Sequence, residues 1–301
     1  MSTLLVSGLI NVETTIKVDR FPVEYTPVRY PFWGVRSTAS GVGYNVAKAL
    51  TTLGNAVHLA SLVGQGLYAD VIRAALRADG LSSDYVLHLL AQTPQSAILY
   101  DGTGRRQINV DLKDVQAFNY PGDRFAAALH GADLAVLCNI NFSREHLATV
   151  RERGLPLATD VHAISDLDDE YNRAFMEAAD VLFMSDERLP LPPEAWARAI
   201  MARYAPAVLV IGLGAEGALL ALREDDSLEH VPAVSTREVV STIGAGDALF
   251  AAFVHVYAQT RDPRLALRKA TVFASYKVGA TGAADGFLTE AALDAWCRRV
   301  T

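Results

Sequence analysis

The chain of 301 residues carries a formal net charge of −7 at pH 7, and 51% of its residues are hydrophobic while 20% are charged. This balance excludes a disordered chain and is typical of a well-packed globular enzyme. The acidic charge also argues against nucleic acid as a partner, because proteins that bind it usually carry a basic face.

Short apolar runs alternate with amphipathic segments along most of the chain. The runs predict strands over 4–8, 57–62, 134–138, 155–160, 181–184 and 208–211. The amphipathic segments predict helices over 45–53, 68–78, 144–153, 169–178 and 194–203. Strands that alternate with helices predict an α/β fold with a mostly parallel central sheet flanked by helices. Ligands bind such a sheet at the carboxyl ends of its strands.

Two segments break this alternation, at about 11–38 and 97–112. Neither has a helical period, and Asp101-Gly102-Thr103-Gly104 predicts a hairpin turn within the second. We expect both to form a small β-sheet that serves as a lid, with ordinary surface loops as the alternative. The whole chain, 1–301, is then expected to be a single domain that carries this lid.

No segment predicts a membrane protein or a secreted one. The first residues lack the basic start of a signal peptide, and their apolar run ends at Asn11. The longest apolar region, 205–222, is interrupted by glycines and a glutamate. Cys138 and Cys297 form no disulfide framework, and Cys138 lies in an apolar run that predicts burial. We therefore expect a cytoplasmic protein with no membrane partner.

The most informative stretch is the glycine-rich run Ser241-Thr242-Ile243-Gly244-Ala245-Gly246-Asp247. Apolar residues recur at helical spacing after it, so the run predicts a tight turn that opens a helix. Free N–H groups and the helix dipole make such a turn an anion site. A carboxylate on this first turn would repel a bound phosphate. Asp247 therefore indicates a base that takes a proton from a hydroxyl attacking that phosphate.

This run resembles the C-terminal signature of ribokinase-like (PfkB-type) carbohydrate kinases, whose order of elements the whole chain follows. The resemblance implies a ribokinase-like fold and ATP-dependent phosphorylation of a hydroxyl, which we expect to be primary, on a sugar or sugar-like substrate. It implies ATP and Mg²⁺ as cofactors. The residues that it assigns to catalysis are Asp247 as general base and the amides of Gly244, Ala245 and Gly246 as anion hole.

The resemblance extends to a sugar-binding motif, in which bare glycines admit a hydroxylated ligand and an amide contacts its hydroxyls. The residues that match it are Gly41, Gly43 and Asn45. A tight turn before a helix would explain the motif equally when it is taken alone. Glu13 stands where the family usually has Asp as a ligand for substrate hydroxyls, and a solvated Glu at a strand end is the alternative.

Two asparagines, Asn139 and Asn141, follow a predicted strand at its carboxyl end. Their amides are expected to face the substrate cleft, although such residues are often turn formers instead. Asp160 ends the next strand, where relatives carry an acid of the phosphate and metal region.

The resemblance also implies a nucleotide-phosphate loop after strand 208–211 and an apolar helix where relatives place adenine and ribose contacts. The residues assigned to the nucleotide are Ser185, Gly212, Gly214, Gly217, Thr242 and Ser275. A hairpin would also account for the three glycines that follow strand 208–211, and a structural role would account for Ser275.

Two departures from the family pattern bear on metals. The motif Asn-x-x-Glu, which organises ATP-bound magnesium, appears as Ser185-Asp186-Glu187-Arg188, so no metal ligand is assigned. Ser241 replaces an acid that helps relatives hold a monovalent cation, which argues against potassium activation.

Two other functions stay open. A nucleoside kinase of the same fold could stack a base on Tyr44, Phe32 or Trp33, although such aromatics could equally pack a homodimer formed through the lid. A ligand-binding regulator that keeps the fold without turnover is the other alternative, which the missing Asn-x-x-Glu pattern favours and the intact Asp247 opposes.

Overall fold

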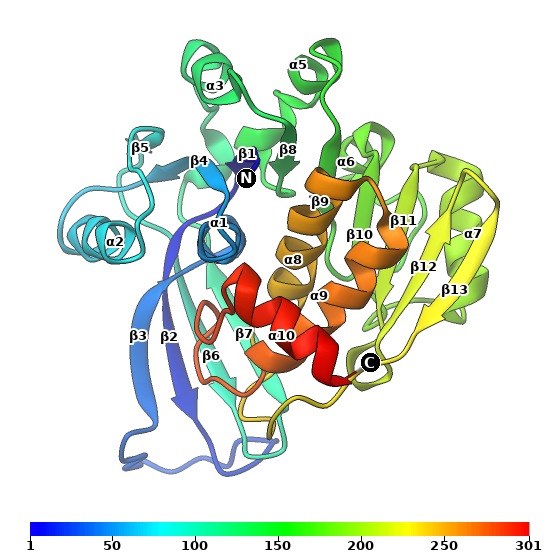
Figure 1. Cartoon of the computed structure of the whole chain (residues 1–301). Helices are drawn as coiled ribbons and strands as arrows, with labels where there is room; N and C mark the ends of the chain where they lie inside the picture. Colours follow the sequence, from blue (N-terminus) through cyan, green and yellow to red (C-terminus); the bar gives the residue numbers. More distant parts are fainter. Residues whose placement is uncertain (301) are drawn as a thin grey trace.

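The computed structural model describes residues 1–300, and two β-sheets organise it (Figure 1). The larger has nine strands in the order β13-β12-β11-β10-β9-β8-β1-β4-β5. Its strands are β1 (Thr3–Ser7), β4 (Ala56–Val63), β5 (Val86–His88), β8 (Leu134–Leu137), β9 (Leu157–Asp160), β10 (Val181–Ser185), β11 (Val208–Gly212), β12 (Ala218–Leu222) and β13 (Ser227–Val231). Neighbours from β11 through β5 pair in parallel, and β12 pairs antiparallel with both β11 and β13. The carboxyl ends of the parallel strands therefore meet along one edge.

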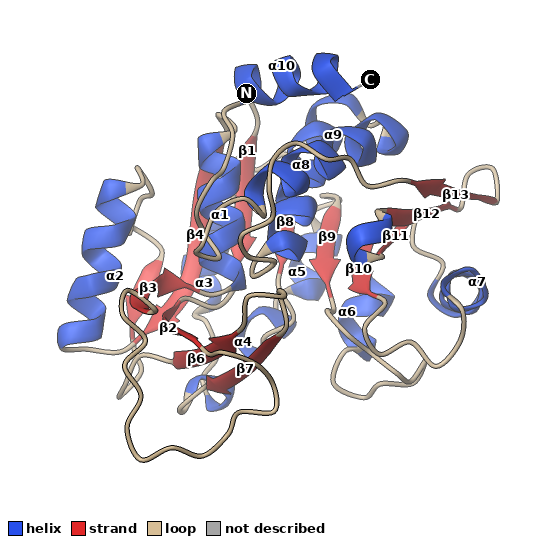
Figure 2. Ribbon diagram, turned by 90° about the horizontal axis from the view of Figure 1, so that it is seen from below, coloured by secondary structure: helices blue, strands red, loops and turns tan. Residues whose placement is uncertain are grey.

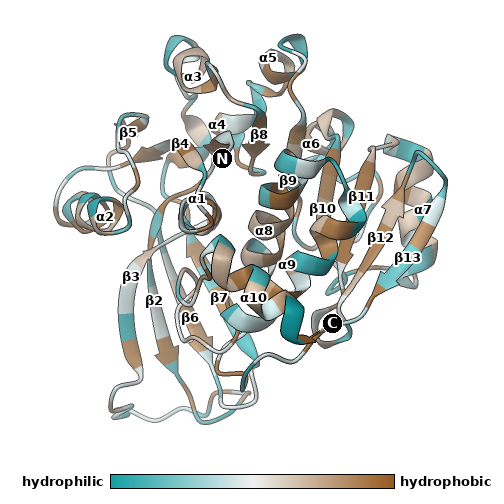
Figure 3. Cartoon of the chain, in the orientation of Figure 1, coloured by the Kyte–Doolittle hydropathy of each residue, from teal (hydrophilic) through white to brown (hydrophobic). Residues whose placement is uncertain are grey.

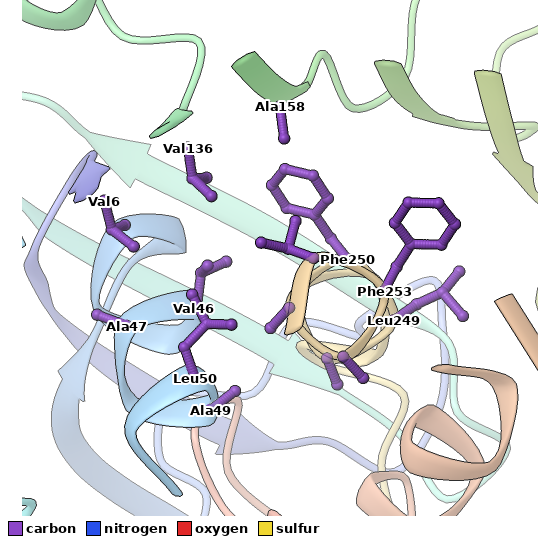
Figure 4. Close-up of a cluster of buried hydrophobic side chains, with 14 of the residues drawn as sticks. Val6, Val46, Ala47, Ala49, Leu50, Val136, Ala158, Leu249, Phe250 and Phe253 are labelled. Carbon is purple, nitrogen blue, oxygen red and sulfur yellow. The ribbon is translucent and has the colours of Figure 1, made fainter. Parts of the chain in front are cut away.

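Helices cover both faces of this sheet, because successive strand residues point to opposite faces and both faces are apolar. One face carries α1 (Val42–Thr52), α2 (Leu67–Ala78), α8 (Ala245–Thr260), α9 (Pro263–Lys277) and α10 (Glu290–Val300). The other carries α3 (Gly122–Leu129), α4 (Asn141–Arg144), α5 (Leu147–Glu152), α6 (Arg173–Ala178) and α7 (Pro193–Tyr204). Figure 4 shows α1 and α8 side by side on the first face, with side chains directed at Val6, Val136 and Ala158 of the strands. In Figure 3 the strands β10, β11 and β12 are mostly brown, whereas α2 and α10 carry both teal and brown residues.

The smaller sheet has four strands in the order β3-β2-β6-β7. These are β2 (Asn11–Lys17), β3 (Val35–Ser40), β6 (Gln95–Tyr100) and β7 (Arg106–Asp111). It projects from the main body, and the connection between β2 and β3 hangs from its far end (Figures 1 and 2). The hairpin turn lies between β6 and β7 as expected, and Asp101 Oδ1 accepts hydrogen bonds from the amides of Thr103 and Arg105 within it.

The architecture confirms the predicted α/β class, the parallel sheet flanked by helices and the separate small sheet. The helix predicted over 144–153 was wrong in its extent. Of this range, 147–152 forms α5, and α4 ends at Arg144. Between the two helices the ring of His146 stacks on that of Phe125, with centroids 3.9 Å apart, and bonds to the carbonyl of Tyr120. The helix predicted from Asp169 starts only at Arg173, since the Asp169 carboxylate accepts the amide of Asn172 and closes a turn before it.

Short elements also join the strands, namely the 3₁₀ turns η1 (Val115–Ala117) and η2 (Gly214–Glu216). Within residues 1–300, no helix has the length and apolar character needed to cross a membrane.

Candidate functional site

Helix α8 is buried along most of its length, which fixes where it begins. Nine consecutive residues, 248–256, are buried. The rings of Phe250 and Phe253 lie 4.9 and 5.1 Å from that of Phe183 in β10. A helix that is apolar all round must be enclosed by protein on every side. Its first turn is thereby held beside the strands of the large sheet.

The turn that precedes α8 needs glycine at one position and leaves space at another. Gly244 has a φ of 76°, and a Cβ there would lie 2.4 Å from the carbonyl oxygen of Ala283. A side chain at Gly244 is therefore excluded by both backbone conformation and space. A Cβ on Gly246 would meet no atom within 4 Å. The two glycines of the motif thus have different structural roles. Gly244 allows the tight turn, whereas Gly246 borders open space.

The backbone amides at this turn are only partly used. The N–H of Ala245 donates to the carbonyl of Thr242 at 3.1 Å. Across residues 1–300, no acceptor is recorded for the N–H groups of Gly244, Gly246 or Asp247. Of the predicted anion hole of Gly244, Ala245 and Gly246, the amide of Ala245 already has an acceptor in the turn, and its contact with an anion stays a prediction. The free donors are those a helix start leaves for an anion.

Asp247 lies on this first turn, half-buried, and its Oδ2 accepts a 2.7 Å hydrogen bond from Nδ2 of Asn45 in α1. Burial raises the pKa of Asp247, and the bond from Asn45 acts in the opposite direction. A raised pKa brings a carboxylate nearer to the range in which it can accept a proton and release it again. Asn45 therefore orients a carboxylate whose surroundings suit a general base.

A chain of polar contacts runs from Asp247 to the small sheet. The Oγ of Ser40, at the end of β3, lies 3.3 Å from Oδ1 of Asn45 and 3.0 Å from Oε2 of Glu13 in β2. Its single proton serves one of these acceptors at a time. The structure thus brings together three predicted residues, Glu13, Asn45 and Asp247, which lie far apart in the sequence.

Glu13 keeps one carboxylate oxygen without a partner among the described residues. The side chain is buried, burial raises its pKa, and Oε1 has no hydrogen bond. Asn11, two residues earlier and so on the same face of β2, donates to Ser96 but leaves its buried Oδ1 equally unpartnered. Buried acceptors of this kind are normally satisfied by protein or by a ligand. Asn11 was missed at the sequence level, although its spacing from Glu13 carried the signal.

Gly41 and Gly43 serve backbone packing. Gly41 has a φ of 100°, and a Cβ there would lie 2.6 Å from the carbonyl oxygen of Leu9. A Cβ on Gly43 would lie 2.4 Å from the carbonyl carbon of Gly8. These glycines allow α1 to begin directly against the end of β1, which is what brings Asn45 to Asp247.

The asparagines after β8 bond mainly to their own surroundings. Nδ2 of Asn139 donates to Asn172 at 3.0 Å. The amide of Asn141 donates to the carbonyl of Gln116 and accepts from Arg144. The structure does not connect either of them to Glu13, Asn45 or Asp247, so their contact with substrate stays a prediction.

Most of the residues predicted to contact the nucleotide lie in two places, one at the carboxyl ends of β10 and β11 and the other in α9. Ser185 pairs in register with Gly212 at the carboxyl ends of β10 and β11. Gly212 also pairs with Ala218 in β12, so the glycine loop is a hairpin that contains η2. Gly217 at its end has a φ of 104°, and a Cβ there would lie 2.1 Å from the carbonyl of Val231.

Gly214 also has a positive φ, of 58°, with open space around it. Ser275 in α9 lies apart from this loop, because its Oγ donates to the carbonyl of Val234 and accepts from the amide of Thr236. Ser275 thus holds the segment that precedes the motif at 241–247.

Arg106 of β7 connects the small sheet to the phosphate side, and sequence reasoning did not identify it. Its guanidinium donates to Oε1 of Glu187 at 2.8 Å and to Oγ1 of Thr242 at 3.4 Å. A second contact joins Arg36 of β3 to Asp285 at 2.6 Å. The small sheet therefore reaches the main body through two ion pairs, one of which contacts the glycine-rich motif.

Within residues 1–300, no group of three or more histidine, cysteine, aspartate or glutamate side chains could hold a metal ion. Magnesium that arrives with a nucleotide needs only one or two protein carboxylates, since phosphates and water complete its shell. Asp186 and Glu187, directly after β10, fit that smaller requirement. A surface hollow of about 270 Å³ lies elsewhere, at the opposite end of β12 from the glycine loop.

The geometry thus places a partly exposed helix start, three free amides and an oriented carboxylate beside unpartnered acceptors. A family model described as pfkB family carbohydrate kinase matches residues 1–290. The chain belongs to this family. Its fold is ribokinase-like, and the enzyme class is that of the carbohydrate kinases.

Individual relatives agree with the family. A 1-phosphofructokinase of Haloferax volcanii is 30% identical over 260 residues, which cover 81% of each chain. Among solved structures, the microbiome-derived acarbose kinase Mak1 superposes with a TM-score of 0.88 at 23% identity, over 99% of each chain. A nucleoside kinase of Burkholderia thailandensis in complex with inosine superposes with a TM-score of 0.80 at 20% identity, over 99% of this kinase and 98% of that chain.

The Asn45–Asp247 bond gives a measurable expectation. Replacing Asn45 by alanine removes a donor to the carboxylate, so the pKa of Asp247 should rise further above that of an ordinary aspartate. A pH titration followed by carboxyl ¹³C NMR, assigned with the Asp247→Asn variant, measures it. Ser40→Ala is the control, because it should raise the pKa of Glu13 while Asn45 still bonds to Asp247. An unchanged Asp247 pKa in Asn45→Ala would contradict the bond.

Proposed function

We propose that this kinase transfers the γ-phosphoryl group of ATP to a hydroxyl, expected to be primary, of a sugar or sugar-like substrate. The observation that carries the proposal is Asp247, oriented by Asn45 on the first turn of α8, beside the free amides of Gly244, Gly246 and Asp247 itself. A base and an anion hole on one helix turn match the two needs of phosphoryl transfer to an alcohol.

In the proposed step, the substrate oxygen forms a bond to the γ-phosphorus while the bond from that phosphorus to the bridging oxygen of ADP breaks. The hydroxyl proton passes to the carboxylate of Asp247. The free amides hold the oxygens of the phosphoryl group in transit. Magnesium bound with ATP would neutralise phosphate charge, and Asp186 would hold it together with Glu187, whose Oε1 pairs with Arg106 in this structure.

The acceptor side of the site supports a hydroxylated substrate. Oε1 of Glu13 and Oδ1 of Asn11 are buried acceptors without partners in the described chain, and sugar hydroxyls are donors that would satisfy them. Asn45 keeps a second amide hydrogen, which would donate to a hydroxyl oxygen of the substrate. Two of the relatives are named for a sugar phosphate and for acarbose, so free and phosphorylated sugars both belong in the test.

A nucleoside substrate is less well supported by the aromatic residues. The ring of Tyr44 is 2% exposed, and its hydroxyl bonds to Asp79, so Tyr44 cannot stack on a base. Phe32 and Trp33 are exposed at the far end of the small sheet. The named activity of the Burkholderia neighbour keeps nucleosides in the substrate panel.

We further propose that the small sheet is a lid on one kinase domain. Ile98 of β6 packs against Ile243 and Ala283 beside the motif, and Arg106 bonds to Thr242. A sheet in this position would exclude water from the transfer, which prevents hydrolysis of ATP.

The base assignment predicts the activity of Asp247→Asn. ATP consumption with magnesium is measured across pentoses, hexoses, their monophosphates and nucleosides. Because a positioned base contributes roughly 10²–10⁴-fold, the variant should lose at least about a hundredfold in kcat on whichever substrate turns over. The exposed Asp226→Asn is the matched control and should retain full activity. Near-full activity of Asp247→Asn would refute the assignment, and ligand binding without any turnover would favour the regulator.

The open space at Gly246 predicts a second variant. Gly246→Ala adds a methyl group where no protein atom lies within 4 Å, so the fold should survive while the phosphoryl group is displaced from the amides. Since one such donor is worth roughly 10²–10³-fold, kcat should fall at least about tenfold. Gly122→Ala is the control, because that Cβ also meets open space but lies at the start of α3 on the other face. Equal activity of the two variants would contradict an anion hole at Gly246.

The far end of the lid predicts self-association. The connection between β2 and β3 exposes large apolar side chains, namely Val23, Tyr25, Val28, Tyr30, Phe32 and Trp33. Monomeric proteins rarely expose a patch of this kind, and we propose that a second copy covers it. Size-exclusion chromatography with light scattering should give twice the chain mass of 32.4 kDa. Phe32→Lys should give the monomer, whereas Leu191→Lys, exposed before α7, should not; a monomeric unmodified chain would contradict the proposal.

A further inference from the structure

Lys277, the last residue of α9, is fully buried next to the glycine-rich motif. Its exposed fraction is 0%, and its Nζ donates a hydrogen bond to the carbonyl oxygen of Ile243. Within residues 1–300, no carboxylate lies within ion-pair distance of this ammonium group. A buried lysine without a direct counter-ion is uncommon and destabilises a fold.

Several charges act on this group from a distance. Burial lowers the pKa of Lys277 to about 8, while Asp247, Asp285 and Glu13 oppose that shift and Arg106 adds to it. A pKa of about 8 still leaves the amine mainly protonated at neutral pH. The chain therefore keeps a positive charge in its interior, close to the carboxylate of the proposed base.

The function of this charge follows from its hydrogen-bond acceptor, the carbonyl oxygen of Ile243. The carbonyl of Ile243 belongs to the same peptide unit as the N–H of Gly244. In a trans peptide these two groups point in opposite directions, so an ammonium that holds the carbonyl also fixes the direction of the N–H. It polarises that N–H as well, because hydrogen bonds in a chain strengthen one another. The N–H of Gly244 is one of the three free donors at the start of α8.

We propose that Lys277 is a positioning residue of the phosphoryl-transfer site, whose buried ammonium orients and polarises the Gly244 amide and adds a fixed positive charge beside the anion hole. The inference rests on the proposed kinase function. It also accounts for Ser241 in place of the acid that helps relatives hold a monovalent cation. Here the positive charge beside the motif comes from the ammonium group of Lys277. Added potassium should then leave the activity unchanged.

The fold does not depend on the ammonium group. The carbonyl of Val278 accepts the amides of Val240 and Ser241 at 2.8 and 3.0 Å, so backbone bonds hold the motif against the end of α9. Removing a buried charge while keeping its volume commonly leaves stability equal or higher. Lys277→Met therefore separates a functional role from a structural one, and Lys269→Met, on the same helix and paired with Asp294 near the surface, is the matched control.

The test compares kcat, the urea midpoint of unfolding, and the binding of ATP and of ADP measured by calorimetry. For Lys277→Met we expect a fall in kcat of at least about tenfold, given that one anion-hole donor is worth roughly 10²–10³-fold. The urea midpoint should stay the same or rise, and ATP affinity should fall more than ADP affinity, because only ATP carries the γ-phosphate. Lys269→Met should change none of these.

Retained kcat, or a loss of kcat that follows a lower urea midpoint, would overturn the inference. In Lys277→Ala, propylammonium should restore part of the activity, whereas propanol should not; equal effects of the two would also count against it. If the unmodified chain phosphorylates nothing, the proposed function fails. The ATP-to-ADP comparison then still tests the role of Lys277 in binding the terminal phosphate, and an unchanged ratio would overturn it separately.

Discussion

The enclosure of α8 is the constraint on which the rest of this structure depends. Nine consecutive buried residues leave the helix no freedom to slide or rotate, and Phe250 and Phe253 lock it against Phe183 of β10. A helix start leaves its first amides without partners wherever it lies. Here the packing decides where those amides lie, and so where the proposed anion site lies relative to the strands.

The contact between α1 and the end of β1 places Asp247 relative to Glu13. The close approach of α1 to the end of β1 at Gly8 and Gly43 permits no side chain on either backbone. That approach carries Asn45 to Asp247, and Ser40 extends the contact to Glu13. Gly41 and Gly43 are therefore needed chiefly for the packing of the backbone. In the proposed reaction they would act indirectly, by setting the orientation of Asn45.

The sequence predicted the architecture well because periodicity reports burial directly. Strands with both faces covered are continuous apolar runs, and the motif at 241–247 places a helix start by its glycines alone. Boundaries failed where one side chain redirected the backbone, as His146 and Asp169 do. Such contacts are tertiary or depend on one capping bond, and no local pattern announces them.

The site was predicted less completely, for a related reason. Asp247, Glu13 and Asn45 could be named from motifs, but Arg106 and Lys277 act across long separations in the chain. A lysine at the end of a helix is ordinarily a surface residue near the helix dipole. Only the packing of α9 against the motif shows that its amine points inward. The use of the Ala245 amide by Thr242 was likewise invisible, since a glycine-rich turn does not reveal which of its donors remain free.

The two ion pairs that join the small sheet to the main body make this contact sensitive to salt concentration. Arg36–Asp285 and Arg106–Glu187 both keep substantial solvent exposure. Exposed pairs of this kind contribute about 0–1 kcal/mol each, and mobile ions screen them over a Debye length of about 8 Å at physiological salt. These two ion pairs therefore hold the small sheet only weakly against the main body, and salt should weaken them further. In the proposed lid, the apolar contact of Ile98 with Ile243 and Ala283 would supply further stabilisation, and so would a bound substrate.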